Sequence, residues 1–270
     1  MIPAIDRYFR FKELGTDLRT EILAGFTTFL TMAYIVFVNP SILQDAGVPA
    51  AGAMAATCIS AALGSLMMGL FAKYPIALAP GMGLNAYFTY TVVQGMGVPW
   101  QVALGAVFLS GVAFVALTAF GIRQLILSAL PHELYASIAA GIGLFIAFVG
   151  LRNAGIIVTN PSTSVALGDL TQPSTLLALF GLLLIGVLMA RRVRAAMLIG
   201  ILTTAAVGAA VGLVRWQPQP FSWTAATSAA LRLDIRGALE IGLLEIVFVF
   251  LFVDLFDNYS GPQNSDQAIS

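Results

Sequence analysis

Acidic side chains lie inside the last apolar stretch of this chain, where Glu245, Asp254 and Asp257 interrupt a run of leucine, valine and phenylalanine. A carboxylate at mid-bilayer is costly unless it faces protein or water, so each of these groups is a candidate functional group. Asp254 and Asp257 are three residues apart, which puts them about 60° apart on one face of a helix. Two carboxyl groups in a partly dry cavity raise each other's proton affinity. The pair therefore suits proton-coupled transport, or acceptance of hydrogen bonds from the N–H groups of a ring.

Structural explanations stay open for the same carboxylates. Asp257 can simply end its helix at the cytoplasmic surface, and this alternative carries as much weight as the functional one. The same alternative is weaker for Asp254. Glu245 precedes Asp254 by nine residues, about 180° round the helix, so we expect it to face elsewhere and to be structural or near the outer interface.

A second candidate site is a helix-breaking segment that reads Tyr74-Pro-Ile-Ala-Leu-Ala-Pro-Gly-Met-Gly-Leu-Asn-Ala-Tyr-Phe88. Irregular backbone at membrane depth is tolerated where it is buried in protein or lines a cavity, and broken helices recur in transporters. We expect a half-helix to open between Pro80 and Gly83, with its N–H groups and the Asn85 amide near the midplane. An amide both donates and accepts hydrogen bonds, which suits the edge of a heterocycle. The alternative is a packing kink in which Asn85 bridges two helices.

The elements that must position these groups are transmembrane helices. Hydrophobic residues make up 59% of the 270 positions and charged residues 10%, against about 25% in soluble domains. The mean hydropathy is +0.92. Apolar stretches occur near 22–43, 51–71, 76–94, 100–120, 136–154, 174–190, 196–214 and 238–257. The sequence therefore predicts an all-α polytopic membrane protein with about eight transmembrane helices of roughly 20 residues each.

Other features limit the functional classes. The formal net charge is zero, which gives no signal for nucleic acid, and the single cysteine, Cys58, cannot form an intramolecular disulfide. We expect no metal and no cofactor. The polar segment 153–172 is interpreted as an extracellular link, and His132 as a surface residue, not a proton relay. The glycines at 141, 143, 150, 181 and 186 are interpreted as helix-packing positions, because small residues let membrane helices approach closely.

Lysine and arginine are placed unevenly, which predicts the orientation. With a cytoplasmic N-terminus, nine lysine and arginine residues lie inside and four outside. The cluster Arg191-Arg192-Arg194 is the strongest single indication of this orientation. We therefore predict a multi-pass protein of the plasma or inner membrane with its N-terminus in the cytoplasm. Residues 1–21 suit a cytoplasmic interfacial segment, or equally a solvated tail. Residues 258–270 form an atypical polar tail.

Several strings resemble one family. Residues 21–40, Glu-Ile-Leu-Ala-Gly-Phe-Thr-Thr-Phe-Leu-Thr-Met-Ala-Tyr-Ile-Val-Phe-Val-Asn-Pro, resemble the first helix of the guanine/hypoxanthine (AzgA-like) permeases, within the nucleobase–ascorbate or xanthine/uracil permease family. Residues 79–88, Ala-Pro-Gly-Met-Gly-Leu-Asn-Ala-Tyr-Phe, resemble their third helix. Residues 140–148, Ala-Gly-Ile-Gly-Leu-Phe-Ile-Ala-Phe, resemble the fifth, and residues 252–257, Phe-Val-Asp-Leu-Phe-Asp, the eighth.

The resemblance implies a 7+7 inverted-repeat transporter fold with a broken third helix, and a nucleobase held between a core and a gate domain. It implies core helices 1–4 over 22–120, gate helices 5–7 over 121–214, and helix 8 over 238–257, opening the second repeat. Asn85 would help to hold the purine, Asp254 would be the principal binding carboxylate, and Asp257 would support it. Transport by proton symport would run through Asp254 and Asp257. Helix one would contribute backbone around Met32–Ile35.

Two departures from the family pattern point to a truncated or frameshifted permease. The chain continues after Asp257 as Asn-Tyr-Ser-Gly-Pro where the family has Thr-Leu-Gly-Thr-like residues, and the second repeat is missing. For the 270-residue chain alone we expect no measurable uptake unless it oligomerises. The expected partners are a purine nucleobase, a proton and the lipid bilayer, with assembly as a homodimer left open and no nucleic acid.

Four other functions are alternatives to a purine permease. A uracil/xanthine-type or anion carrier of the same fold is the alternative within transporters, and a non-transporting remnant is a further one. An intramembrane aspartyl protease needs two aspartates facing each other from two helices and a Gly-x-Gly-Asp pattern. Here Asp254 and Asp257 share one helix and that pattern is absent. A serine protease is no better supported, so we do not expect an enzyme.

Overall fold

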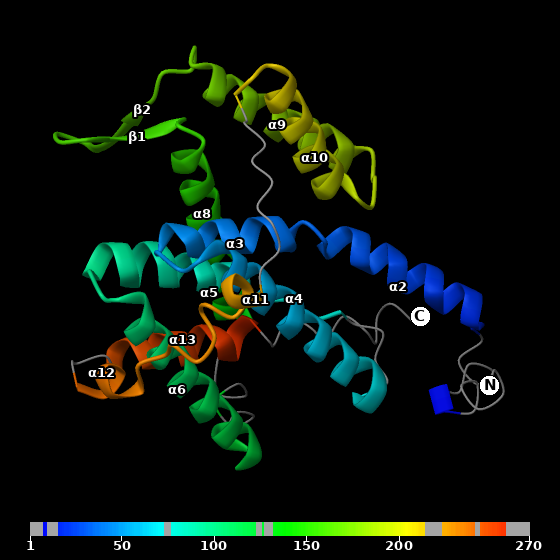
Figure 1. The fold of residues 1–270 in the computed structure, drawn as a ribbon, viewed down its shortest axis with the longest axis vertical. Coiled ribbons are helices and arrows are strands. Elements are labelled where there is room, and N and C mark those ends of the chain that lie inside the picture. The colour runs from blue at the N-terminus through cyan, green and yellow to red at the C-terminus, as the bar shows by residue number, and fades with distance from the viewer. Residues whose placement is uncertain are drawn as a thin grey trace. The chain divides into compact units, whose positions relative to one another are not determined.

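The computed structural model describes residues 8–9, 16–72, 77–122, 126, 132–213, 223–240 and 244–257. Most of the described elements are helices (Figure 1). The chain divides into two compact units. The first unit comprises residues 1–40, 54–80 and 151–222, and the second comprises residues 41–53, 81–150 and 223–270. The polar tail predicted over 258–270 lies outside the described residues.

The first predicted stretch is a helix with an interruption. Helix α2 (Leu18–Met32) begins after Asp17, whose carboxylate accepts a hydrogen bond from the Thr20 N–H at 3.0 Å. It ends at Met32, and two residues separate it from α3 (Ile35–Asp45). The Ala33 N–H still donates to the Phe29 carbonyl, so the break is a turn in an otherwise continuous helical rod.

Helix α4 (Ala50–Met67) follows and continues as the π-helical segment η1 (Met68–Ala72). Within the first unit, the Asn39 side-chain amide donates to the Thr57 hydroxyl at 2.8 Å, and both side chains are buried. This bond ties α3 to α4. A buried polar pair of this kind is stable because each group meets a partner in place of water.

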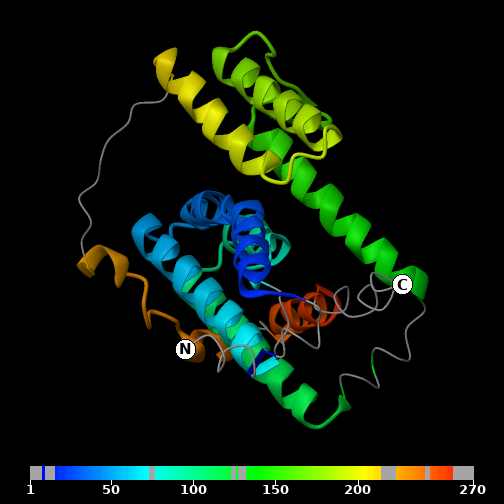
Figure 2. The same cartoon turned by 90° about the vertical axis from the view of Figure 1, so that its right-hand side faces the viewer.

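Helices α9 (Pro173–Ala190) and α10 (Ala196–Ala210) lie side by side in the first unit (Figures 1 and 2). Small residues let them approach closely. A Cβ on Gly181 would lie 2.7 Å from the Thr204 hydroxyl, and one on Gly200 would collide with Ile185. The packing role predicted for Gly181 is confirmed. A Cβ on the other four predicted glycines would meet no described atom within 4 Å.

The all-α prediction is wrong for the predicted extracellular link. Strands β1 (Ile157–Asn160) and β2 (Ser164–Leu167) form an antiparallel hairpin there, with Ile157 opposite Leu167. The Asn160 side chain accepts a hydrogen bond from the Ser162 N–H at 2.8 Å, which closes the turn. The hairpin follows α8 (His132–Asn153), which begins at the histidine interpreted from the sequence as a surface residue.

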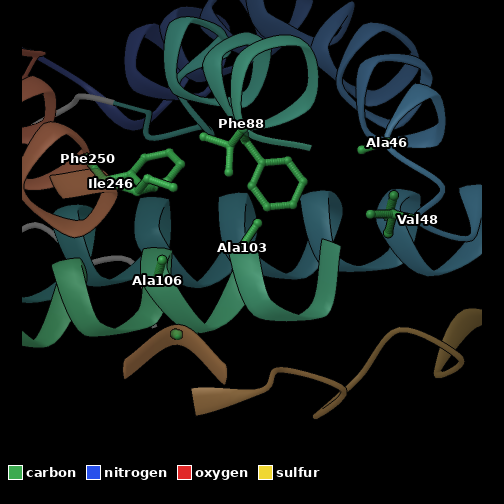
Figure 3. Close-up of a cluster of buried hydrophobic side chains, with 10 residues drawn as sticks. Ala46, Val48, Phe88, Ala103, Ala106, Ile246 and Phe250 are labelled. Carbon is green, nitrogen blue, oxygen red and sulfur yellow. The ribbon is translucent and has the colours of Figure 1, made fainter. Parts of the chain in front are cut away.

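The second unit is built around α6 (Trp100–Ala119). Four segments pack on or near this helix: α5 (Met82–Ala86), η2 (Tyr87–Gly95), α12 (Ile235–Glu240) and α13 (Leu244–Asp257). The short helix α11 (Trp223–Ala226) precedes α12. Phe88 points toward Ala103 of α6, and Ile246 and Phe250 come from α13 (Figure 3). This cluster of buried apolar side chains is the core of the unit.

Among the described residues, four helices are long and apolar enough to cross a membrane: Leu18–Asp45, Ala50–Phe71, Trp100–Ala119 and Pro173–Ala190. Shorter apolar helical stretches in the described part of the chain are Ala140–Asn153, within α8, and α10 (Ala196–Ala210). Each of the eight predicted stretches coincides with helical elements in the described part of the chain. The count of eight crossings and the inverted repeat stay predictions.

Candidate solute-binding site

The helix expected to open between Pro80 and Gly83 begins at Met82. Residues 77–81 are not helical, and Gly81 at the N-cap has an extended backbone (φ −69°, ψ 119°) and no capping side chain. A Cβ on Gly83 would lie 2.7 Å from the Ile142 side chain of α8, so the absence of a side chain lets α5 and α8 approach closely. The proline and glycine pattern thus identified the start of the helix that carries Asn85.

Asn85 lies on α5 and is half-buried. The segment after it, η2, is π-helical and is anchored to the end of α3. The Thr89 hydroxyl donates to the Ile42 carbonyl at 3.0 Å, and the Tyr90 hydroxyl donates to the Asp45 carboxylate at 2.8 Å. The Gln94 amide donates to the Asp45 backbone carbonyl at 2.9 Å. These bonds fix the segment that positions Asn85.

Asp254 lies on α13 and is also half-buried. Helix α13 contacts α5, so the two helices that carry Asn85 and Asp254 are neighbours in the second unit. The Tyr87 and Phe250 rings meet edge to face, with centroids 5.3 Å apart. Phe250 is one helical turn before Asp254 and therefore lies on the same side of α13. The structure thus makes the helices that carry Asn85 and Asp254 neighbours, and a shared ligand stays a prediction.

The other two carboxylates of α13 lie at the ends of the helix. Asp257 is its last residue, and its side chain lies outside the described part of the structure. Glu245 lies in the first turn and is exposed. The structure therefore brings the helices of Asn85 and Asp254 together, and it leaves the role of Asp257 as a prediction.

A cavity of about 560 Å³ in the first unit was not predicted from the sequence. It is lined by α2, the start of α3, α4 and the non-helical residues 77–79. Met32, Ala33 and Ile35, which belong to the predicted helix-one contribution, contact this cavity. The Ser65 hydroxyl and Thr57 hydroxyl in its wall are both hydrogen-bonded within the protein. The runs of small residues in α4 were the only available signal, and such runs are more often packing surfaces.

These features define the class of protein: a helical membrane protein with interrupted helices and half-buried polar groups between them. Residues 19–261 match the model of the Permease family (Xan_ur_permease), which covers most of the chain. The chain belongs to this family of permeases, as the residue strings indicated.

Individual relatives with similar sequences are also named as permeases. The chain is 54% identical over 94% of its length to a protein of Methanocaldococcus jannaschii named only as a candidate permease, covering 58% of that protein. It is 45% identical to the adenine permease AdeP of Escherichia coli, over 94% of this chain and 57% of the relative. It is 44% identical to the guanine/hypoxanthine permease PbuG of Bacillus subtilis, over 93% of this chain and 60% of the relative. The chain thus spans somewhat more than half the length of these relatives.

Proposed function

We propose that the protein transports purine nucleobases across the membrane by proton symport, with Asn85 and Asp254 holding the base. The observation that carries the proposal is the similarity to relatives named as adenine and guanine/hypoxanthine permeases. The contact between α5 and α13 supports the choice of residues, because it makes the helices of Asn85 and Asp254 neighbours.

The chemistry of the two groups complements a purine. The Asn85 amide can donate to a ring nitrogen or a carbonyl oxygen and can accept from an N–H. The Asp254 carboxylate can accept from a ring N–H, and hydrogen bonds to a charged group are the stronger kind. Asp257, three residues further on, would share the proton with Asp254. Protonation would neutralise a carboxylate in a medium where charge is costly, which couples the proton to the movement of the base.

The test is equilibrium binding of radiolabelled adenine, guanine and hypoxanthine to the purified chain, followed by uptake in cells that lack their own purine transport. Replacing a group that bonds through a charge costs about 10- to 100-fold in affinity, and a neutral one roughly threefold to tenfold. We therefore expect the larger loss for Asp254→Ala and the smaller for Asn85→Ala. Asp254→Asn keeps the shape and should remove the dependence of binding on pH.

Glu245→Gln is the matched control, because it removes an exposed carboxylate from the same helix. It should bind purines as the unaltered chain does. Binding that persists unchanged in Asp254→Ala would rule out the assigned carboxylate. Displacement of the label by uracil or sulfate, with no displacement by unlabelled purine, would replace the purine class with the alternative carriers.

A further inference from the structure

A connecting segment, residues 223–239, comprises α11 and most of α12 and lies against the start of α6. The Asp234 N–H donates to the carbonyl of Gln101, the second residue of α6, at 2.9 Å. A Cβ on Gly105, one turn further along α6, would collide with the Asp234 carbonyl, so the segment touches the helix directly. Helix α6 is a candidate membrane span, and a span begins where the hydrocarbon core of the bilayer begins. The connecting segment therefore lies at the level of a membrane–water interface, whichever side of the membrane is cytoplasmic.

A contact with the start of α4 gives the same level. A Cβ on Gly52, the third residue of α4, would lie 2.8 Å from the Ala229 Cβ. Helix α4 begins the candidate span Ala50–Phe71, and residues 41–53 belong to the same unit as the connecting segment. Missing side chains in the first turns of two spans thus let the segment approach both helices closely.

Large apolar side chains on the connecting segment are exposed. Leu231 is 94% exposed and Trp223 is 76% exposed. On α12, Ile235 and Leu239 are four residues apart, so they share a face, and both are exposed. Ala238, which is fully buried, fixes the packed side of the same helix. The segment therefore presents an apolar surface away from the unit at the level where lipid begins.

Leu231 also occupies an unusual backbone position. Its φ is +56°, in the left-handed region, which is an outlier for a bulky side chain. In water, an exposed leucine offers no apolar burial to offset the free energy that this conformation costs. At a lipid interface, transfer of the side chain out of water does offset it. The backbone conformation therefore indicates a role for the exposed side chain.

We propose that the connecting segment is an interfacial anchor, whose apolar side chains insert among the acyl chains just below the phospholipid headgroups. Arg232 and Arg236 are exposed beside these side chains, and arginine at this level extends its charged end to lipid phosphates. Tryptophan is enriched at the same level. A second copy of the chain is the less suitable partner, because a symmetric contact would bring the like-charged arginines of two copies together. The proposal does not use the purine site.

The experiment measures the depth of the segment by spin labelling. In the Cys58→Ser background, which has no thiol, Ala230→Cys is labelled with a nitroxide and the protein is reconstituted into phosphatidylcholine vesicles. Oxygen concentrates in the bilayer and a nickel chelate stays in water, so the ratio of their collision rates with the label reports depth. We expect this ratio to be higher at Ala230→Cys than at Ser162→Cys, in the exposed turn of the hairpin.

Leu231→Gly tests the inserted side chain in the same labelled background. It removes both the leucine and the backbone strain, so thermal stability should be retained while the ratio of inserted to withdrawn segment falls roughly tenfold. Ser164→Gly is the matched control, because it relieves a left-handed position (φ +63°) in the hairpin and should leave the depth at residue 230 unchanged.

The other outcomes contradict the anchor. Equal access of the nickel chelate to the labels at Ala230→Cys and Ser162→Cys would place the segment in water and overturn the proposal. Access of neither reagent to the label at residue 230 would also overturn it and assign the surface to a protein partner. An unchanged depth in Leu231→Gly would rule out the leucine as the inserted group.

Discussion

Asp17 and Asp254 are carboxylates in different surroundings within one chain. Asp17 is the N-cap residue of α2, and its carboxylate accepts a hydrogen bond from the Thr20 N–H in the first turn. Bonding to Thr20 stabilises the ionised form and holds the pKa of Asp17 below its ordinary value. Asp254 lies half-buried in an apolar helix, where a carboxylate needs a partner. Burial and surroundings, not residue type, separate the two.

The start of α2 should therefore depend on pH. Because the pKa of Asp17 is lower in the folded chain than in the unfolded chain, its contribution is complete above the unfolded value. That contribution is lost as the pH falls through the folded value. We expect the protection factor of the Thr20 amide, taken relative to its intrinsic exchange rate at each pH, to fall in acid, measured by hydrogen exchange in detergent micelles. Asp17→Asn keeps an acceptor without the titration, so its Thr20 amide should show no such step. An identical acid step in Asp17→Asn would assign the change to another group.

At the level of elements, close packing of α9 against α10 depends on single missing side chains. A Cβ on Gly181 would lie 2.7 Å from the Thr204 hydroxyl, whereas a Cβ on Gly186, in the same helix, would meet no described atom within 4 Å. We expect Gly181→Ala to destabilise the protein by about 1–3 kcal/mol through overpacking. Gly186→Ala should be neutral or stabilising by up to about 1 kcal/mol, because alanine favours a helix.

Thermal unfolding in detergent measures both effects. The double variant Gly181→Ala/Thr204→Ala removes the side chain that the new methyl group would strike, and it should recover most of the lost stability. Equal stabilities of the two glycine variants would show that the helices separate more easily than the packing indicates.

Sequence patterns predicted some elements and missed others, for physical reasons. The break before Met82 was predictable, because Pro80 and Gly81 disfavour a helix there. The break at Ala33–Tyr34 was not, since neither residue disrupts a helix by itself. The hairpin over 157–167 has a local signal in the turn residues Asn160 and Pro161, which lie between two short β-branched runs.

The site could be predicted only in part. Apolar surroundings marked Asp254, and an amide beside a helix break marked Asn85. The contact between α5 and α13 joins segments more than 150 residues apart in the chain, and the anchoring of Tyr90 on Asp45 also depends on tertiary packing. Local patterns do not encode such long-range pairings.

For the whole molecule, the predicted orientation can be tested by labelling. Cys58 is the single cysteine, so Cys58→Ser gives a background without thiols. In that background, Ser162→Cys at the exposed hairpin turn should react with a membrane-impermeant maleimide in intact cells. Thr16→Cys, before α2, should react only after the membrane is permeabilised. The reverse pattern would contradict a cytoplasmic N-terminus, and the Cys58→Ser parent alone should take up no label.

The π-helical segment η2 makes the length of the chain at this point as important as its composition. A π-helix closes its hydrogen bonds over one more residue than an α-helix does. Deleting a single residue between Tyr87 and Tyr90 would let ordinary α-helical bonds form there. It would also turn Asn85 by about 100° relative to the anchor of Tyr90 on Asp45. A one-residue insertion or deletion here would therefore redirect the amide without changing any residue that binds.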